Sequence, residues 1–169
     1  MFSRLLIFLT ALCVSVPAFA APAARTVSNR WQIPAGSILV QTGRHRLLFA
    51  VDADHVIEYP VAVGRRGARW KGTALIARKA SWPAWHPTAK ARRRDRRLPR
   101  AVAGGRRNPM GARALYLHRG GRDTFYRIHG TNSPSSIGRS VSSGCIRMRN
   151  ADVIRLASMV RIGAVVRVV

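Results

Sequence analysis

Short apolar runs separated by turn residues dominate the chain between residues 37 and 80. These runs are rich in β-branched and aromatic side chains, and each is only a few residues long. They are SILVQT (37–42), RLLFAVD (46–52), VIEYPVAVG (56–64) and TALIARK (73–79). Runs of this length and composition are typical of β-strands that pair with their neighbours in sequence. The pattern therefore predicts a meander of strands over this part of the chain.

The same pattern returns near the C-terminus. ALYLHR (114–119) and TFYRIHG (124–130) flank the turn GGRD and predict a hairpin, and AVVRVV (164–169) predicts a last strand. The fold class expected is mainly β, a β-sandwich or a partly closed barrel, with one or two short helices.

Only one segment has the periodicity of a helix. NADVIRLASMV (150–160) places Val153, Ala157 and Val160 on one face of a helix, and Asn150 stands at the position of an N-cap. This predicts a short helix just before the last strand.

The periodic pattern is interrupted between residues 81 and 113. The segment contains four prolines, two tryptophans and the basic run RRRDRR (92–97). Long insertions without periodicity are usually lids, binding loops or disordered segments. Two interpretations of the basic run stay open, a solvated loop and a surface that collects an anionic polymer.

The N-terminus has the layout of a secretory signal peptide. One arginine precedes an apolar run (5–16), and the small residues Ala18 and Ala20 follow it, which predicts cleavage after Ala20. The apolar run is too short to span a bilayer. We expect residues 21–36 to be a short extended leader, since they are rich in alanine and contain two prolines. Residues 37–169 would then form one domain.

The charge of the chain is strongly unbalanced. Its 169 residues include 30 Lys and Arg but 6 Asp and Glu, a formal net charge of +24. Such a charge favours a polyanionic partner. Nucleic acid fits by charge alone, but an exported protein rarely meets nucleic acid. The interleaved aromatic residues of single-strand binders are also missing. We therefore expect no nucleic-acid partner.

Cys145 is the only cysteine beyond the predicted signal peptide. An oxidising compartment usually pairs cysteines, so an unpaired one is a buried apolar filler, an intermolecular linker or a reactive thiol. The residues alone leave these three alternatives open. A catalytic thiol would need a base or a positive field close by.

His129 is the candidate base. It ends the strand YRIH, in which alternation places it on the face opposite Tyr126 and Ile128. The loop that follows (131–144) is rich in Ser and Gly, and we expect it to bring Cys145 back beside the end of this strand.

Gly144 directly precedes the cysteine. Because it has no side chain, it lets backbone amides approach a substrate carbonyl closely. The amides of Gly144 and Cys145 would then form an oxyanion hole. The other histidines (His45, His55, His86 and His118) show no spacing that would build a metal site with Cys145. We expect neither a metal nor another cofactor.

The segment HGTNSPSSIGRSVSSGCIRMRNAD (129–152) resembles the signature of the YkuD-type L,D-transpeptidases. In that family a histidine in an HGT-like triplet is followed, after a spacer, by a GCIR segment that carries the nucleophile. Further segments resemble the family as well, so that the resemblance covers about residues 38–169. These are YPVAVG (59–64), WPAWHP (82–87), LPR (98–100) and NPMGARALYLHR (108–119).

The resemblance implies roles for individual residues. Cys145 would be the nucleophile and His129 the base, oriented by a backbone carbonyl, so that Gly130 fits the pattern. Many relatives have SHGC where this chain has SSGC, and the role of that second histidine is therefore in doubt. Ser143, at its position, is either a hydrogen-bond partner or a small loop residue. Arg147, the arginine of GCIR, either holds the site together or meets a substrate carboxylate.

The reaction implied by the resemblance is acyl transfer on peptidoglycan stem peptides in the periplasm or cell envelope. Cys145 would attack the carbonyl of the third residue, release D-alanine and pass the acyl group to an amine of a second stem or of an envelope protein. Water as acceptor would give a carboxypeptidase. The segment 81–113 would act as a lid, carbapenems would inhibit the enzyme, and we expect a monomer.

Other classes of protein fit less well. Papain-like wall hydrolases place the cysteine before the histidine, whereas here His129 precedes Cys145. Sortases share this order but have a TC pair and a distant arginine. A catalytically silent module that binds peptidoglycan is the alternative from a different class.

Overall fold

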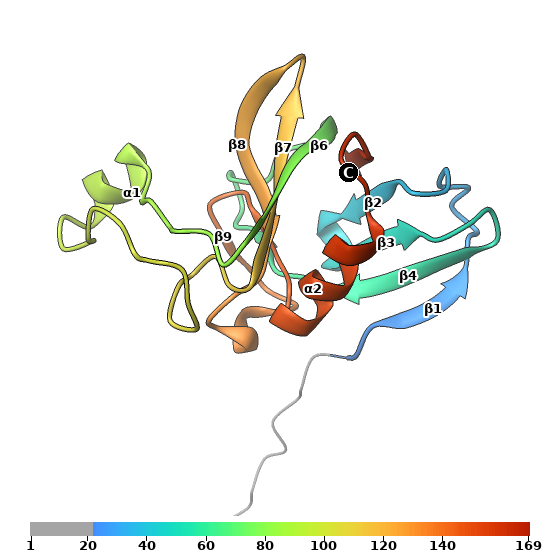
Figure 1. Cartoon of the computed structure of the whole chain (residues 1–169), viewed down its shortest axis with the longest axis horizontal. Helices are drawn as coiled ribbons and strands as arrows, with labels where there is room; N and C mark the ends of the chain where they lie inside the picture. The colour runs from blue at the N-terminus through green and yellow to red at the C-terminus, as the bar shows by residue number, and fades with distance from the viewer. Residues whose placement is uncertain (1–21) are drawn as a thin grey trace, which may run out of the picture.

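The structure is a computed structural model that describes residues 22–169 (Figure 1). The predicted signal peptide and its cleavage position lie outside the described residues. In the described range, no helix is both long enough and apolar enough to cross a membrane.

The described chain is mainly β, as the sequence predicts. Its strands are β1 (Arg25–Ser28), β2 (Ile38–Gln41), β3 (Arg46–Ala50), β4 (His55–Pro60), β5 (Val63–Gly64), β6 (Gly72–Ser81), β7 (Arg113–Arg119), β8 (Arg122–His129), β9 (Ser140–Ser142), β10 (Ile146–Arg147) and β11 (Val165–Val168). The helices are α1 (Ala89–Arg94) and α2 (Asn150–Met159), with 3-10 turns η1 (Thr42–Arg44) and η2 (Pro134–Ser136). Within residues 22–169, nine strands form one mixed sheet in the order β1-β4-β3-β2-β11-β6-β7-β8-β10, and β5 and β9 form a second, small sheet.

The large sheet bends so that its two halves enclose one core, with α2 packed against them (Figure 1). Alternate residues of the strands point into this core, as the apolar pattern requires. Its members come from both halves and from α2, and include Val40, Leu47, Tyr59, Ile76, Leu115, Ile128 and Leu156. Each such side chain contributes about 1.5–3 kcal/mol by burial, so that the core fixes the strands that carry the site.

The N-terminal segment differs from the expected unpacked leader. Strand β1 pairs antiparallel with β4, and Ile33 is buried with apolar residues of β3 and β4. Asn29 makes this possible, because its side chain bonds both the amide and the carbonyl of Ile33 and the carbonyl of Ala53. Residues 25–33 are therefore part of the folded domain.

The segment 81–113 is ordered by its own hydrogen bonds. Thr88 caps α1, which stands apart from the sheets at the left of Figure 1. The buried Asn108 side chain donates to three carbonyl oxygens of the segment, those of Pro83, Val102 and Ala103. One asparagine thus ties together a loop that has no apolar periodicity.

Candidate active site

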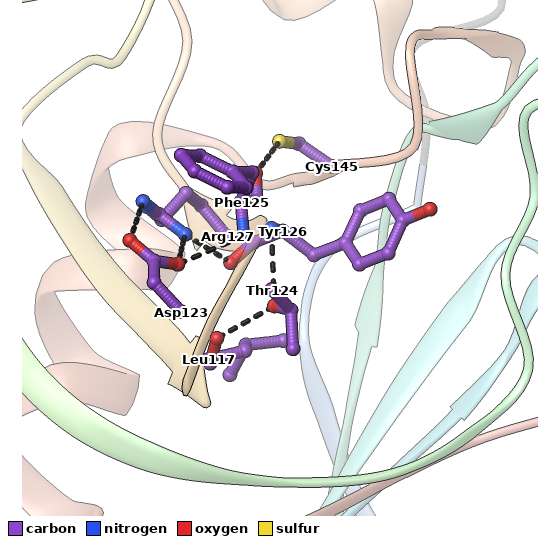
Figure 2. Close-up of polar contacts among 7 residues, drawn as sticks. All are labelled: Leu117, Asp123, Thr124, Phe125, Tyr126, Arg127 and Cys145. Carbon is purple, nitrogen blue, oxygen red and sulfur yellow. Dashed lines mark hydrogen bonds and ion pairs between the residues drawn. The ribbon is translucent and has the colours of Figure 1, made fainter. Parts of the chain in front are cut away.

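The residues after Cys145 bring it beside β8. Strand β10 runs parallel to β8 and places Arg147 opposite His129. This confirms the predicted return of the chain to the end of β8. The Cys145 thiol donates to the carbonyl oxygen of Phe125, with Sγ and O 3.9 Å apart (Figure 2).

The residues before Cys145 are fixed as well. Strand β9 pairs parallel with β5, and the backbones of Ala62 and Arg147 exchange two hydrogen bonds of 2.8 and 2.9 Å. The buried Ser142 shapes the turn between these pairings, because its Oγ donates to the Cys145 carbonyl at 2.6 Å and accepts from the Gly144 amide at 3.1 Å. Sequence reasoning missed Ser142, although a serine two residues before a glycine is a signal for a tight turn.

Gly144 is required for a reason other than the predicted one. Its φ is +126°, and a Cβ there would lie 2.5 Å from Cε1 of Tyr126 and 3.0 Å from the carbonyl oxygen of Ala68. Side chains rarely adopt this backbone conformation. Its amide donates to Ser142 Oγ in this structure, so the predicted role of this amide in an oxyanion hole stays a prediction.

His129 is buried at the end of β8, with 4% of its surface exposed. Its Nδ1 lies 2.6 Å from the carbonyl oxygen of Gly130. A carbonyl only accepts, so Nδ1 carries the proton and the neutral ring keeps its lone pair on Nε2. The imidazole is thus held by a backbone carbonyl, as the resemblance implies.

The electrostatic surroundings keep His129 neutral. Burial, followed by the charge of Arg147, lowers the pKa of His129 from 6.5 to about 4, although hydrogen bonds to the backbone of Gly130 and Met110 act in the opposite direction. At neutral pH the imidazole is therefore able to accept a proton.

The half-buried Cys145 is a protonated thiol at rest. Burial raises the pKa of Cys145 above its ordinary 9.0, and the Arg127 amide and the charges of Arg127 and Arg147 offset only part of this effect. The resting pair is a thiol and a neutral imidazole rather than an ion pair.

Arg147 contributes to the site through its backbone and its charge. Its backbone joins β10 to Ala62 and to β8, and its guanidinium lowers the pKa of His129 and opposes the rise in the pKa of Cys145. Its Nε is buried without a hydrogen-bond partner among the described residues. These contacts support the first of its two predicted roles, in which it holds the site together.

Residues 35–168 match the YkuD family, the L,D-transpeptidase catalytic domain. The chain belongs to this family. The protein named Probable L,D-transpeptidase ErfK/SrfK from Escherichia coli is 36% identical to it over 141 residues, which are 78% of this chain and 43% of that protein. The YkuD-type domain described here thus spans less than half the length of the curated relatives ErfK/SrfK and YbiS.

Solved structures share the fold of this YkuD-type domain. One, named a probable carnitine operon oxidoreductase caia from Brucella melitensis, has a TM-score of 0.60 and 36% identity over 88% of this chain and 92% of its own. Another, LD transpeptidase LdtMt1 in complex with imipenem, has a TM-score of 0.56 and 15% identity over 78% of this chain and 57% of its own. The second likeness shows the fold alone.

Asn150 is not the helix cap that the sequence predicts. The N-cap of α2 is Arg149, while Asn150 Oδ1 accepts from the amides of Ala112 at 3.0 Å and Thr131 at 3.2 Å. The oxygen occupies the space that a side chain at Gly130 would need. In this YkuD-type domain Asn150 therefore joins the start of β7 to the turn that follows the histidine.

Ser143 is exposed and makes none of the hydrogen bonds found among the described residues. It lines a cavity of ≈ 250 Å³ together with Tyr126 and the turn at residues 65–69. Of its two predicted roles, the structure supports that of a small loop residue.

A bulge in β8 presents Phe125 next to the thiol, and sequence reasoning missed it. Tyr116 pairs with Arg127 and His118 pairs with Asp123. A step of two residues on β7 therefore lies opposite a step of four residues on β8, and the extra residues form the bulge. Phe125 has a left-handed φ of 60°, and 73% of it is exposed. Figure 2 shows its carbonyl directed at the thiol.

Local hydrogen bonds impose this bulge. Thr124 Oγ1 donates to the carbonyl of Leu117 at 2.6 Å and accepts from the amide of Tyr126 at 3.2 Å. Asp123 accepts from the Phe125 amide and holds Arg127 with two bonds of 2.7 Å. The Phe125 carbonyl, which accepts the hydrogen bond of the thiol, is thus rigidly placed.

Proposed function

We propose that this chain is a peptidoglycan L,D-transpeptidase in which Cys145 is the nucleophile and His129 the base. The observation that carries the proposal is the parallel pairing of β10 with β8, which sets the half-buried thiol beside the strand that ends in a neutral histidine. A thiol nucleophile and a nearby base are the requirements of covalent acyl transfer.

The first half of the reaction forms a thioester. Sγ attacks the carbonyl carbon of the third residue of a stem peptide while its proton passes to His129. The C–N bond to the terminal D-alanine then breaks, and the imidazolium returns the proton to the leaving amine. The Cys145 amide is the proposed donor to the oxyanion, since the Gly144 amide is engaged by Ser142.

The second half releases the product. An amine attacks the thioester carbon, gives a proton to His129 and displaces the sulfur, which regains that proton as the thiol. A new amide bond replaces the broken one, so nothing is oxidised or reduced. The amine comes from a second stem or from an envelope protein. Water in its place would make the enzyme an L,D-carboxypeptidase.

The setting proposed is the periplasm or cell envelope. The predicted signal peptide supports export, and the net charge of +24 suits a surface of anionic polymers. Family membership supports peptidoglycan as the donor.

A carbapenem tests whether the thiol is enzymatically active. Imipenem is a suitable probe because the fold relative LdtMt1 is known in complex with it. Wild-type protein should gain the mass of one imipenem, and Cys145→Ser should gain none. If the wild type gains no adduct while iodoacetamide shows that its thiol is free, the protein is a silent module. Products from defined muropeptides then distinguish amine from water as acceptor.

The segment 81–113 is proposed as a lid that limits hydrolysis. Its base contacts the site, because the Asn132 side chain donates to the Arg107 carbonyl at 2.8 Å and the Met110 backbone raises the pKa of His129. Exclusion of water protects a thioester. Deletion of residues 88–97 should therefore increase hydrolysis relative to transfer, measured from product masses. An unchanged ratio in a deletion variant of normal thermal stability would contradict the lid.

A further inference from the structure

A cavity lined by arginines lies beside the nucleophile, and nothing in the reaction above uses it. Its volume is ≈ 250 Å³, and its walls include Arg65, Arg66, Arg69, Tyr126 and Ser143. We call it the arginine pocket.

The arginine pocket begins one residue from the thiol. Gly144 precedes Cys145, and a Cβ on it would touch both Tyr126 and the carbonyl oxygen of Ala68. Both of these residues line the pocket, as does Ser143. One residue step along a peptide is about 3.8 Å, so a peptide whose carbonyl meets Sγ has its neighbouring groups within reach of the pocket.

The positive charge of the pocket is not neutralised. None of its lining residues is acidic, and Glu58 and Asp123 are paired with arginines elsewhere. Within residues 22–169, the side chains of Arg65 and Arg66 take part in no ion pair or hydrogen bond. Two arginines whose side chains have no partner among the described residues therefore line a space that has room for an anion.

The wall of the pocket formed by Arg69 and Tyr126 is held rigidly. Arg69 donates through Nε to the Gly64 carbonyl at 3.1 Å and through a terminal nitrogen to Ser140 Oγ at 2.7 Å. The buried Trp70 stacks on Tyr126, with ring centroids 4.8 Å apart and planes at 10°. Fixed walls reduce the entropy lost when a ligand binds.

We propose that the arginine pocket binds a carboxylate of the donor stem peptide and so positions the scissile carbonyl at Sγ. This inference rests on the proposed function. Arginine forms paired, charge-assisted hydrogen bonds with carboxylates, which suits it to this task. Three carboxylates of the stem peptide lie close to the scissile bond and are candidates for this site. They belong to the terminal D-alanine, to the side chain of the third residue and to the residue before it.

A pair of small alkylating agents tests the pocket without any peptidoglycan. Iodoacetate and iodoacetamide both alkylate Cys145 by displacing iodide, and they differ in carrying a carboxylate or a neutral amide. The rate ratio of iodoacetate to iodoacetamide, followed at Cys145 by peptide mass spectrometry, should fall about tenfold in Arg65→Gln/Arg66→Gln. The matched control Arg30→Gln/Arg161→Gln removes two exposed charges elsewhere and should keep the ratio within about twofold. Equal ratios in the two double variants would overturn the proposal.

Donor peptides then identify the carboxylate. KM for the stem tetrapeptide should rise about tenfold in Arg65→Gln/Arg66→Gln, and Arg65→Lys/Arg66→Lys should recover part of the loss. Donors in which a single carboxylate is converted to an amide show which carboxylate the pocket binds. For the donor that lacks this carboxylate, KM should be the same in the wild type and in Arg65→Gln/Arg66→Gln. If KM is unchanged for every donor while imipenem still acylates Cys145, the pocket inference fails and the proposed function stands.

Discussion

Phe125 holds a left-handed backbone although its ring is largely exposed. Such a conformation costs a non-glycine residue about 1–2 kcal/mol, and an exposed ring recovers little of that by burial. The hydrogen bonds of Thr124 and Asp123 enforce it. Strain that is maintained by neighbouring residues commonly marks a functional site, and here it aims a carbonyl at the nucleophile.

This strain is measurable by substitution. Phe125→Gly should be about 1 kcal/mol more stable than Phe125→Ala, since glycine tolerates the left-handed backbone. Denaturant unfolding of the two variants measures the difference. An alanine variant as stable as the glycine variant would show that the bulge relaxes freely.

The protonation states of Cys145 and His129 predict a specific pH profile. Because burial raises the pKa of the thiol, alkylation by iodoacetamide should be slow at pH 7 and should increase with a midpoint above 9.0, the ordinary value. Acylation of Cys145 by imipenem, which needs no amine acceptor, should persist down to about pH 4, since the pKa of His129 is lowered to about 4. Rates measured between pH 4 and 10 test both limits. Rapid alkylation at pH 5 would instead reveal a thiolate–imidazolium pair.

The elements that could be predicted are those with enough residues to show a period. Strands β6, β7 and β8 and helix α2 lie close to where the apolar pattern puts them. By contrast, β9 and β10 have only three and two residues, and their backbone pairing leaves no trace in hydrophobicity. The site depends on these two short strands, so its position was predictable from the resemblance and the loop composition rather than from periodicity.

Asn150 shows how one side chain joins such elements. Asn150→Ala leaves the buried amides of Ala112 and Thr131 without an acceptor, which should lower the free energy of unfolding by about 2–3 kcal/mol. The rate of transfer should fall as well, because the adjacent Gly130 carbonyl holds the imidazole. Chemical denaturation and donor turnover measure the two effects.

Two further variants test whether the loss of stability comes from the missing acceptor oxygen of Asn150 rather than from the removal of any asparagine side chain. Asn150→Asp keeps the acceptor oxygen and should recover most of the stability. Asn132→Ala removes one exposed hydrogen bond and should cost less than about 1 kcal/mol. A fully stable Asn150→Ala would contradict the proposed connection.

At the scale of the whole molecule, the large number of arginines makes it impossible to recognise from the sequence which of them line the proposed binding pocket. Arg65 and Arg66 are far from Cys145 in sequence and look like any other part of a chain with 30 basic residues. The pairing of β5 with β9 and the packing of Gly144 against Ala68 and Tyr126 bring them near the thiol. Conversely, Cys145 and His129 were identifiable early because one signature contains both.

The net charge predicts that donor capture depends on salt. Turnover at low donor concentration should decrease as the Debye length shrinks from about 10 Å at 0.1 M to about 3 Å at 1 M salt. A fully amidated donor provides the control and should respond little. Equal salt dependence for the two donors would exclude steering by charge.

The short turn that carries Cys145 is tied to Ala62 and β5 on one side and to β8 on the other. The turn therefore has no position of its own, and the thiol stays in place only while both neighbouring strands are paired. Local opening of β5 or β8 would release the nucleophile even if the rest of the core remained intact.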